Sequence, residues 1–450
     1  MHCHTVTNVH GRKYRPSCPP EDVIVLILGF LTTAKDLAHC VRASRTLHRC
    51  AVPLLYRSIT FHTVRRLGTN TDIILPQIAL LQKPEYGRYV HHVRQSGSLG
   101  SSEPEIVNTS RTALRLCTNL RSFSWANAEQ DPMNALELVT HLEILKAFSL
   151  RSLKISTSAG IIEDAWAELA QFVGLQSLDI WTARAQTPLS CDWARNLRSS
   201  LESLSLGAVC RGERELSFLA QLPKLKHLGM KTVNNDIVFQ AMALLPNLKT
   251  LHIQYLDVSL QHTPQPFSAS LERLVTGPCF SSQYLGEPFW NWVFTLAPKA
   301  SLKALRVCTT SSSEMSSTTV QRLAEIHRET LEEIDVGQTV IGIEDLAYIC
   351  RMFPKLRILS CGINCTMNEL DDAISAAYNI ETLHLRLSKK LAKLWPFVQL
   401  DEITRWMLRE HSKLRTIALG ALVYEGKWVW CEPAVKFEVI SRMSGSVHVL

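Results

Sequence analysis

A short apolar motif, Leu-x-x-Leu-x-Leu or a close variant of it, returns twelve times along this 450-residue chain. Its spacing averages about 27 residues and ranges from 23 to 34, close to the 20–29 residues of leucine-rich repeats. A repeat of this period predicts a solenoid, and the uneven spacing predicts an irregular one. The copies begin at Leu120, Leu150, Leu175, Leu201, Leu225, Leu248, Leu271, Leu302, Leu331, Leu356, Ile380 and Leu414.

Each copy has the pattern of one strand. In the copy that begins at Leu225, Leu228 and Met230 are two residues apart and therefore face the same side of a strand. Apolar residues at three- and four-residue steps predict helices between the strands, over 163–173, 236–245, 318–328, 343–352 and 400–410. The expected fold is thus an α/β solenoid, a horseshoe with parallel strands on its concave face.

The asparagine or cysteine that usually holds the turn of such repeats is mostly missing. Three residues after the last motif leucine, only Cys279 and Asn364 carry the expected type. The turns of the other repeats must therefore be held in another way.

Composition and charge narrow the classes of protein. The longest apolar runs fall short of a membrane span, and thirteen scattered cysteines favour reduced thiols in the cytoplasm or nucleus. Residues 1–66 carry ten Lys or Arg and three acidic residues, so this segment has a net charge of +7. The whole chain has the same net charge of +7. We expect an acidic protein partner at this end rather than nucleic acid, since no long basic run follows.

Residues 18–60 do not follow the repeat and predict three short helices. Pro19 and Pro20 precede Glu21 and Asp22, a typical helix start. Thr33 and Asp36 have capping-box spacing at the second helix, and a third runs from Ser44 towards Ala51, before an extended segment at 58–61. The first helix is apolar on every side, so a module of this size cannot bury all of it.

This segment resembles an F-box. The resemblance rests on Pro20-Glu21-Asp22-Val23, Ile27-Leu28, Asp36-Leu37, Val41-Arg42 and Pro53-Leu54-Leu55-Tyr56. It implies docking on a Skp-type adaptor, and through that adaptor on cullin and RING subunits, with the repeats holding an unknown protein substrate for ubiquitin transfer. The residues implied in adaptor binding, or in support of that face, are Pro20, Val23, Ile24, Ile27, Leu28, Leu37, Val41 and Leu47.

The sequence carries no recognisable catalytic, phosphate-binding or metal-binding motif, so we expect a non-enzymatic protein without cofactors. Two alternatives stay open: an interaction scaffold without a role in ubiquitination, and a leucine-rich GTPase activator. Residues expected to point outward from the inner strands, and hence candidates for substrate binding, are Trp181, Lys231, His252, Gln254, Arg306 and Arg386.

Four regions are expected along the chain. They are a disordered basic N-terminus (1–17), the F-box (18–60), a linker with a solenoid cap (61–110) and the solenoid itself (111–450).

Overall fold

A computed structural model describes most of the chain. The described residues are 19–31, 33–62, 75–96, 104–127, 133–158, 160–182, 189–209, 213–231, 235–255, 270–278, 286–309, 312–387, 399–431 and 434–443. The predicted disordered N-terminus lies outside them. The chain divides into two units, residues 1–175 and 176–450, each described by itself.

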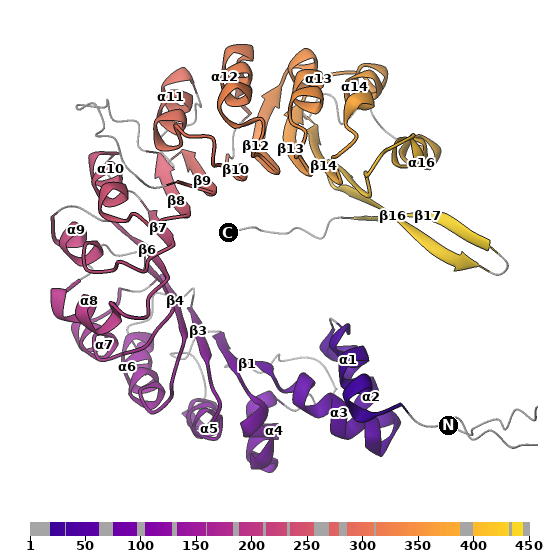
Figure 1. Cartoon of the computed structure of the whole chain (residues 1–450). Coiled ribbons are helices and arrows are strands. Elements are labelled where there is room, and N and C mark those ends of the chain that lie inside the picture. The colour runs from indigo at the N-terminus through magenta and orange to yellow at the C-terminus, as the bar shows by residue number, and fades with distance from the viewer. Residues whose placement is uncertain are drawn as a thin grey trace, which may run out of the picture. The chain divides into compact units, whose positions relative to one another are not determined.

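The first unit begins with three helices and continues as alternating strands and helices (Figure 1). Strands β1 to β4 pair in parallel, each with the next along the chain. The elements are α1 (Glu21–Gly29), α2 (Ala34–Ala43), α3 (Arg45–Leu55), β1 (Ser58–His62), α4 (Pro76–Gln82), the 3₁₀ helix η1 (Pro84–Tyr89), β2 (His92–Ser96), α5 (Pro104–Arg115), β3 (Ser122–Asn127), α6 (Met133–Leu145), β4 (Ser152–Thr157) and α7 (Glu163–Leu169).

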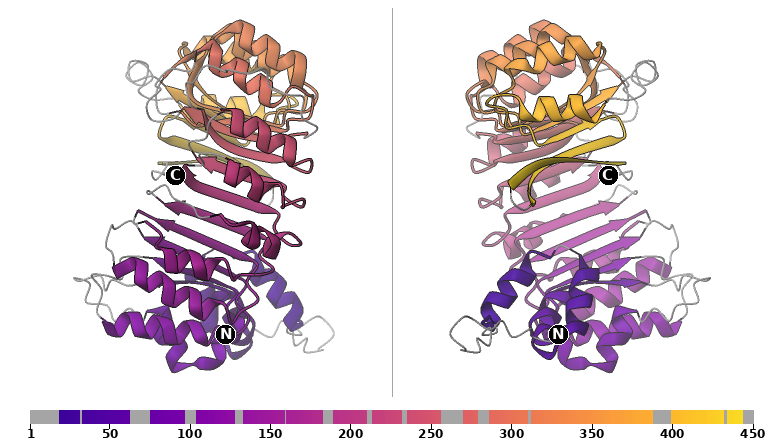
Figure 2. Two further views of the ribbon diagram at one scale, coloured as in Figure 1. Left: turned by 90° about the vertical axis from the view of Figure 1, so that its left-hand side faces the viewer. Right: turned by 90° about the vertical axis from the view of Figure 1, so that its right-hand side faces the viewer.

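The second unit repeats the same alternation, with its helices on the outer side of the strands (Figure 1) and its strands as successive parallel rungs (Figure 2). Its first part holds β5 (Ser177–Thr182), α8 (Cys191–Leu197), β6 (Ser203–Val209), α9 (Glu213–Leu219), β7 (His227–Lys231), α10 (Asn235–Leu244), β8 (Thr250–Tyr255), β9 (Arg273–Pro278) and α11 (Glu287–Leu296).

The remainder of this unit is more irregular and ends on two antiparallel strands. Its elements are β10 (Ala304–Val307), β11 (Glu314–Met315), α12 (Ser317–His327), β12 (Glu333–Ile341), α13 (Ile343–Met352), β13 (Ile358–Ile363), α14 (Met367–Ala373), η2 (Ile374–Ala376), β14 (Thr382–Leu387), α16 (Leu400–Leu408), β15 (Thr416–Leu419), β16 (Leu422–Cys431) and β17 (Ala434–Met443). The described residues thus hold seventeen strands, nearly all parallel, and the predicted α/β solenoid is confirmed.

Every copy of the sequence motif coincides with one strand. The strand begins two residues after the leading leucine or isoleucine, which is buried in all twelve copies. The residues that follow alternate, with Leu228 and Met230 of β7 in the core. The five predicted inter-strand helices are present as α7, α10, α12, α13 and α16.

In three of the repeats an asparagine at another position bonds to the preceding repeat. Asn119, Asn247 and Asn379 stand directly before the leading residue of their motifs. Their side-chain amides donate to carbonyl oxygens of the preceding repeat, at 2.7 Å to Arg88, 2.9 Å to Pro223 and 2.7 Å to Pro354. These bonds join neighbouring repeats just before each strand, whereas the usual asparagine position follows the strand.

The last two strands depart from the prediction that the solenoid continues to residue 450. β15 and β16 are antiparallel and so are β16 and β17, which form a long hairpin instead of another strand–helix repeat. The physical reason is visible in the sequence. Val435, Phe437 and Val439 alternate with Lys436 and Glu438, and Trp428, Val429 and Trp430 stand on the other side of Glu432-Pro433. Aromatic and β-branched residues on both sides of a proline-containing turn are typical of a hairpin.

Candidate functional site

Helix α1 is formed by the residues that the sequence singled out. Pro20 is extended and precedes the helix, where its missing N–H costs nothing, and the carboxylates of Glu21 and Asp22 lie at the positive end of the helix dipole. The Pro20 carbonyl accepts the first helical hydrogen bond from the Ile24 N–H at 3.1 Å. The side chain of Glu21 also forms an ion pair with Arg49 of α3, which ties the start of α1 to the third helix.

The other two helices have side-chain caps. The Thr33 hydroxyl oxygen accepts a hydrogen bond from the Asp36 N–H at 3.1 Å, as the capping-box spacing predicts. The Ser44 hydroxyl likewise accepts from the Leu47 N–H at 3.1 Å. Helix α3 extends further than expected, through Pro53 to Leu55, since a proline in the last turn removes only one of the final helical bonds.

The three helices enclose a small core of their own. Ile24 and Leu28 of α1 meet Leu37 of α2 and Cys50 and Ala51 of α3, all buried. Leu31, Cys40, Val41, Leu47, Leu54 and Leu55 pack around this cluster. The three predicted helices are present and share a core of their own.

The other sides of α1 are apolar and open. Leu26 is 69% exposed, Ile27 57% and Phe30 83%, and Val23 and Val25 are also exposed. Burial of side chains of this size is a main source of free energy in protein association, and contiguous exposed apolar residues mark interaction sites. The prediction that α1 cannot bury all its sides within the module is therefore confirmed. We call Val23, Leu26, Ile27 and Phe30 the α1 surface.

The predicted adaptor-binding residues divide into two groups by position. Pro20, Val23 and Ile27 are exposed and lie on or beside the α1 surface. The others, Ile24, Leu28, Leu37, Val41 and Leu47, belong to the small core or pack against it and so support that surface from beneath. Leu26 and Phe30 were missing from the predicted set, although the all-round apolarity of the helix was the signal that could have added them.

The module is joined to the sheet of the first unit by its last strand. β1 pairs in parallel with β2 from Ser58 opposite His92 to His62 opposite Ser96. The ring of Tyr56, just after α3, lies 4.9 Å from that of Tyr86 in η1. These contacts involve α3, β1 and η1, and the described residues of this unit leave the α1 surface exposed.

The second candidate site is polar. It lies on the inner side of the strands in the second unit. Arg306 of β10 donates to Glu333 of β12 at 2.9 Å and lies 3.5 Å from the Asp335 carboxylate, and Arg273 reaches Glu333 at 3.0 Å. His252 and Arg386 are exposed on β8 and β14. The neighbouring His384 has its pKa lowered, mainly by burial.

The other three predicted substrate-binding residues are less exposed or lie at the edge of the described set. Trp181 of β5 is half-buried and lies over Gly207 of β6, where a Cβ atom would come within 2.6 Å of the indole ring. Gln254 is half-buried on β8, and Lys231 is the last residue of β7, with its side chain outside the described set. Trp181 is thus in part a packing residue.

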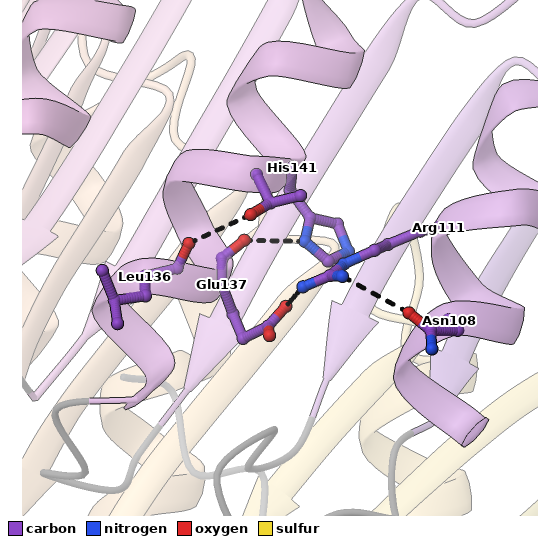
Figure 3. A network of polar contacts seen from close by, with 6 residues as sticks. Asn108, Arg111, Leu136, Glu137 and His141 are labelled. Atoms are coloured by element: carbon purple, nitrogen blue, oxygen red, sulfur yellow. Dashed lines mark hydrogen bonds and ion pairs between the residues drawn. The ribbon is translucent and has the colours of Figure 1, made fainter. Parts of the chain in front are cut away.

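A polar network lies between α5 and α6, with His141 buried, Arg111 and Glu137 half-buried and Asn108 exposed (Figure 3). The Arg111 guanidinium forms an ion pair with Glu137 and contacts Asn108, and the ring nitrogen Nδ1 of His141 bonds the Glu137 carbonyl oxygen at 2.8 Å. Burial lowers the pKa of His141 to about 4, and the Arg111 charge acts in the same direction. A neutral histidine held in this way serves packing rather than proton transfer.

Among the described residues, no cluster of three or more His, Cys, Asp or Glu side chains is placed to bind a metal. None of the described helices combines the length and apolarity that crossing a bilayer requires.

Comparison with known families supports the N-terminal module. The family model for F-box-like domains matches residues 20–62, which are α1 to α3 and β1. Residues 20–62 are therefore an F-box-like domain. No curated protein matches the chain.

Proposed function

We propose that this chain is the substrate-recognition subunit of a Skp–cullin–F-box type ubiquitin ligase. In this proposal the F-box-like domain binds a Skp-type adaptor, the adaptor brings cullin and RING subunits, and the repeats bind a protein substrate. The observation that carries the proposal is the α1 surface. It is an exposed apolar row on an F-box-like domain whose own core is already closed.

The energetics of the α1 surface support a protein partner. Complete burial of Leu26, Ile27 and Phe30 would contribute roughly 1.5–3 kcal/mol for each side chain. The free energy of binding must also offset the loss of entropy on association. The α1 surface alone is small, so binding needs contacts beside it. The exposed Lys35, Arg42 and Arg45 at α2 and α3 could supply them towards an acidic adaptor.

The repeats act in this proposal by proximity rather than by bond chemistry. A substrate held on the inner strands has a raised effective concentration near a loaded ubiquitin-conjugating enzyme. His252, Gln254, Arg306 and Arg386 are the proposed contact residues, together with Trp181 and Lys231. The scaffold alternative differs in one respect: the adaptor would bind without cullin.

The test compares surface variants that leave the small core intact. Leu26→Asp with Ile27→Asp places two charges on the α1 surface, whereas Val173→Asp places one at an equally exposed apolar position elsewhere in the same unit. Purified full-length proteins are titrated with a Skp-type adaptor in a calorimeter, and cullin is then added. We expect loss of adaptor binding in the double variant only, and a complex of wild type with both adaptor and cullin.

Two results would count against the proposal. Unchanged adaptor binding by the double variant, with helix content intact by circular dichroism, would show that α1 is not the docking surface. Adaptor binding that excludes cullin would favour the scaffold alternative.

A further inference from the structure

The terminal hairpin, formed by β16 and β17, carries an exposed apolar face. The proposed function uses the α1 surface and the inner strands and assigns no role to this face. Trp428 and Trp430 of β16 are 58% and 66% exposed. They lie opposite Phe437 and Val435 of β17, so all four side chains share one face of the hairpin. The rings of Trp428 and Phe437 are 5.0 Å apart.

Only the inner end of this face is covered within the unit. Tyr424 is buried, and a Cβ atom on Gly426 would meet the Met407 sulfur of α16 at 2.6 Å, as well as the Phe437 ring. The outer end, with Trp430 and Val435, extends past α16 (Figure 1). The hairpin is therefore fixed at one end and open at the other.

The opposite face of the hairpin carries charged residues, with acidic side chains beside basic ones. Lys427 lies opposite Glu438, and Glu425 forms an ion pair with Arg442. Along β17 itself, Lys436 and Glu438 stand two residues apart, on either side of Phe437. The strand thus carries a basic and an acidic residue placed symmetrically about one aromatic residue.

The outer edge of β17 is available for pairing. β17 is registered against β16 along its full length, and no other described strand is registered against it. A ten-residue exposed edge strand is a template for another strand unless something covers or blocks it. Most of its side chains are exposed, including Lys436, Ile440 and Met443.

We propose that two copies of this chain associate by antiparallel pairing of their β17 strands, centred on Phe437. In this register Lys436 of each copy faces Glu438 of the other. Two such pairs form, and the two-fold axis relates them. On the apolar face, Phe437 faces its own equivalent and Val435 faces Val439. The occupant of the edge is therefore a second copy, because the strand is complementary to itself in both charge and apolar pattern.

The neighbouring registers are disfavoured by the same residues. A pairing centred on Lys436 places two lysines opposite each other, and one centred on Glu438 places two glutamates opposite each other. Like charges directly opposite in a sheet are destabilising. This association is independent of the proposed function, since the F-box-like domain and the inner strands take no part in it.

A charge exchange on the full-length protein tests the pairing. Lys436→Glu and Glu438→Lys are each measured alone, then mixed in equal amounts, by sedimentation velocity over a range of concentrations. Because the two-fold axis doubles every contact, each single variant changes two attractive pairs into two repulsive ones. We expect the dimer dissociation constant to rise about tenfold or more for each variant alone. The mixture should form a heterodimer of nearly wild-type affinity, since its pairs are again opposite in sign.

Two control variants separate the edge from the hairpin and from its face. Lys427→Glu also disturbs the Lys427–Glu438 pair but lies on β16, away from the proposed edge, and should leave the dimer intact. Trp430→Ser removes an exposed ring from the apolar face and should leave the edge pairing intact as well. A monomeric wild type at every concentration, a mixture that fails to dimerise, or a dimer lost only with Trp430→Ser would each overturn the proposal.

Discussion

Acidification provides a direct test of the packing around His141. The ring is buried between α6 and the rings of Phe123 and Trp125 on β3, and its Nε2 has no hydrogen-bond partner among the described residues. Burial lowers the pKa to about 4 from the ordinary 6.5. The unfolded chain therefore binds a proton more readily than the folded chain between pH 6.5 and 4, and stability must fall as the pH drops through that range.

The magnitude follows from the shift. The pKa of His141 differs by about 2.5 units between the unfolded and the folded chain, which corresponds to about 3.4 kcal/mol of free energy of unfolding in total. About 2 kcal/mol of this stability is lost between pH 7 and pH 5. We expect wild type to lose this much more free energy of unfolding than His141→Leu over the same interval. The assay is urea denaturation followed by circular dichroism at both pH values.

The comparison concerns the pH slope, so any change that the leucine makes at pH 7 cancels. His327 also titrates with a pKa lowered to about 4 by burial, and it contributes equally to both proteins. An identical pH dependence in wild type and in His141→Leu would refute the reasoning, because it would show that the folded state accepts the proton at no cost.

Two further predictions concern the repeats. Asn247→Ala removes the bond between neighbouring repeats at the Pro223 carbonyl and should lower the free energy of unfolding by about 1 kcal/mol, measured by urea denaturation; an unchanged midpoint would show that the bond is dispensable. Gly207→Val places a side chain against the Trp181 ring and should lower the free energy of unfolding by about 1–3 kcal/mol, measured in the same way. The same substitution in a Trp181→Ala background should lower it less. Equal costs in the two backgrounds would contradict the contact.

The strands and helices were predictable because the repeat imposes one period on the chain. Each leading leucine or isoleucine is buried, and strands such as β4 and β5 place every second residue in the core, so local pattern and global fold agree. The three helices of the F-box-like domain were predictable for a similar reason, since Pro20, Thr33 and Ser44 mark their starts.

Other features depended on contacts that a pattern does not specify. The bonds of Asn119, Asn247 and Asn379 require knowledge of which carbonyl lies beside each amide. The exposure of Leu26 and Phe30, against the burial of Ile24 and Leu28, depends on where α3 packs. The hairpin was missed because Leu414 continues the repeat, although Glu432-Pro433 and the alternation over residues 435–439 indicated a different structure.

The most direct measurement of the central claim is hydrogen exchange of the full-length protein, with and without a Skp-type adaptor, followed by mass spectrometry. We predict slower exchange over residues 21–30 on adding the adaptor, with peptides of the inner strands unchanged, and no slowing in Leu26→Asp with Ile27→Asp. Slowing confined to other segments, or equal slowing in the double variant, would contradict the assignment of α1 as the docking surface.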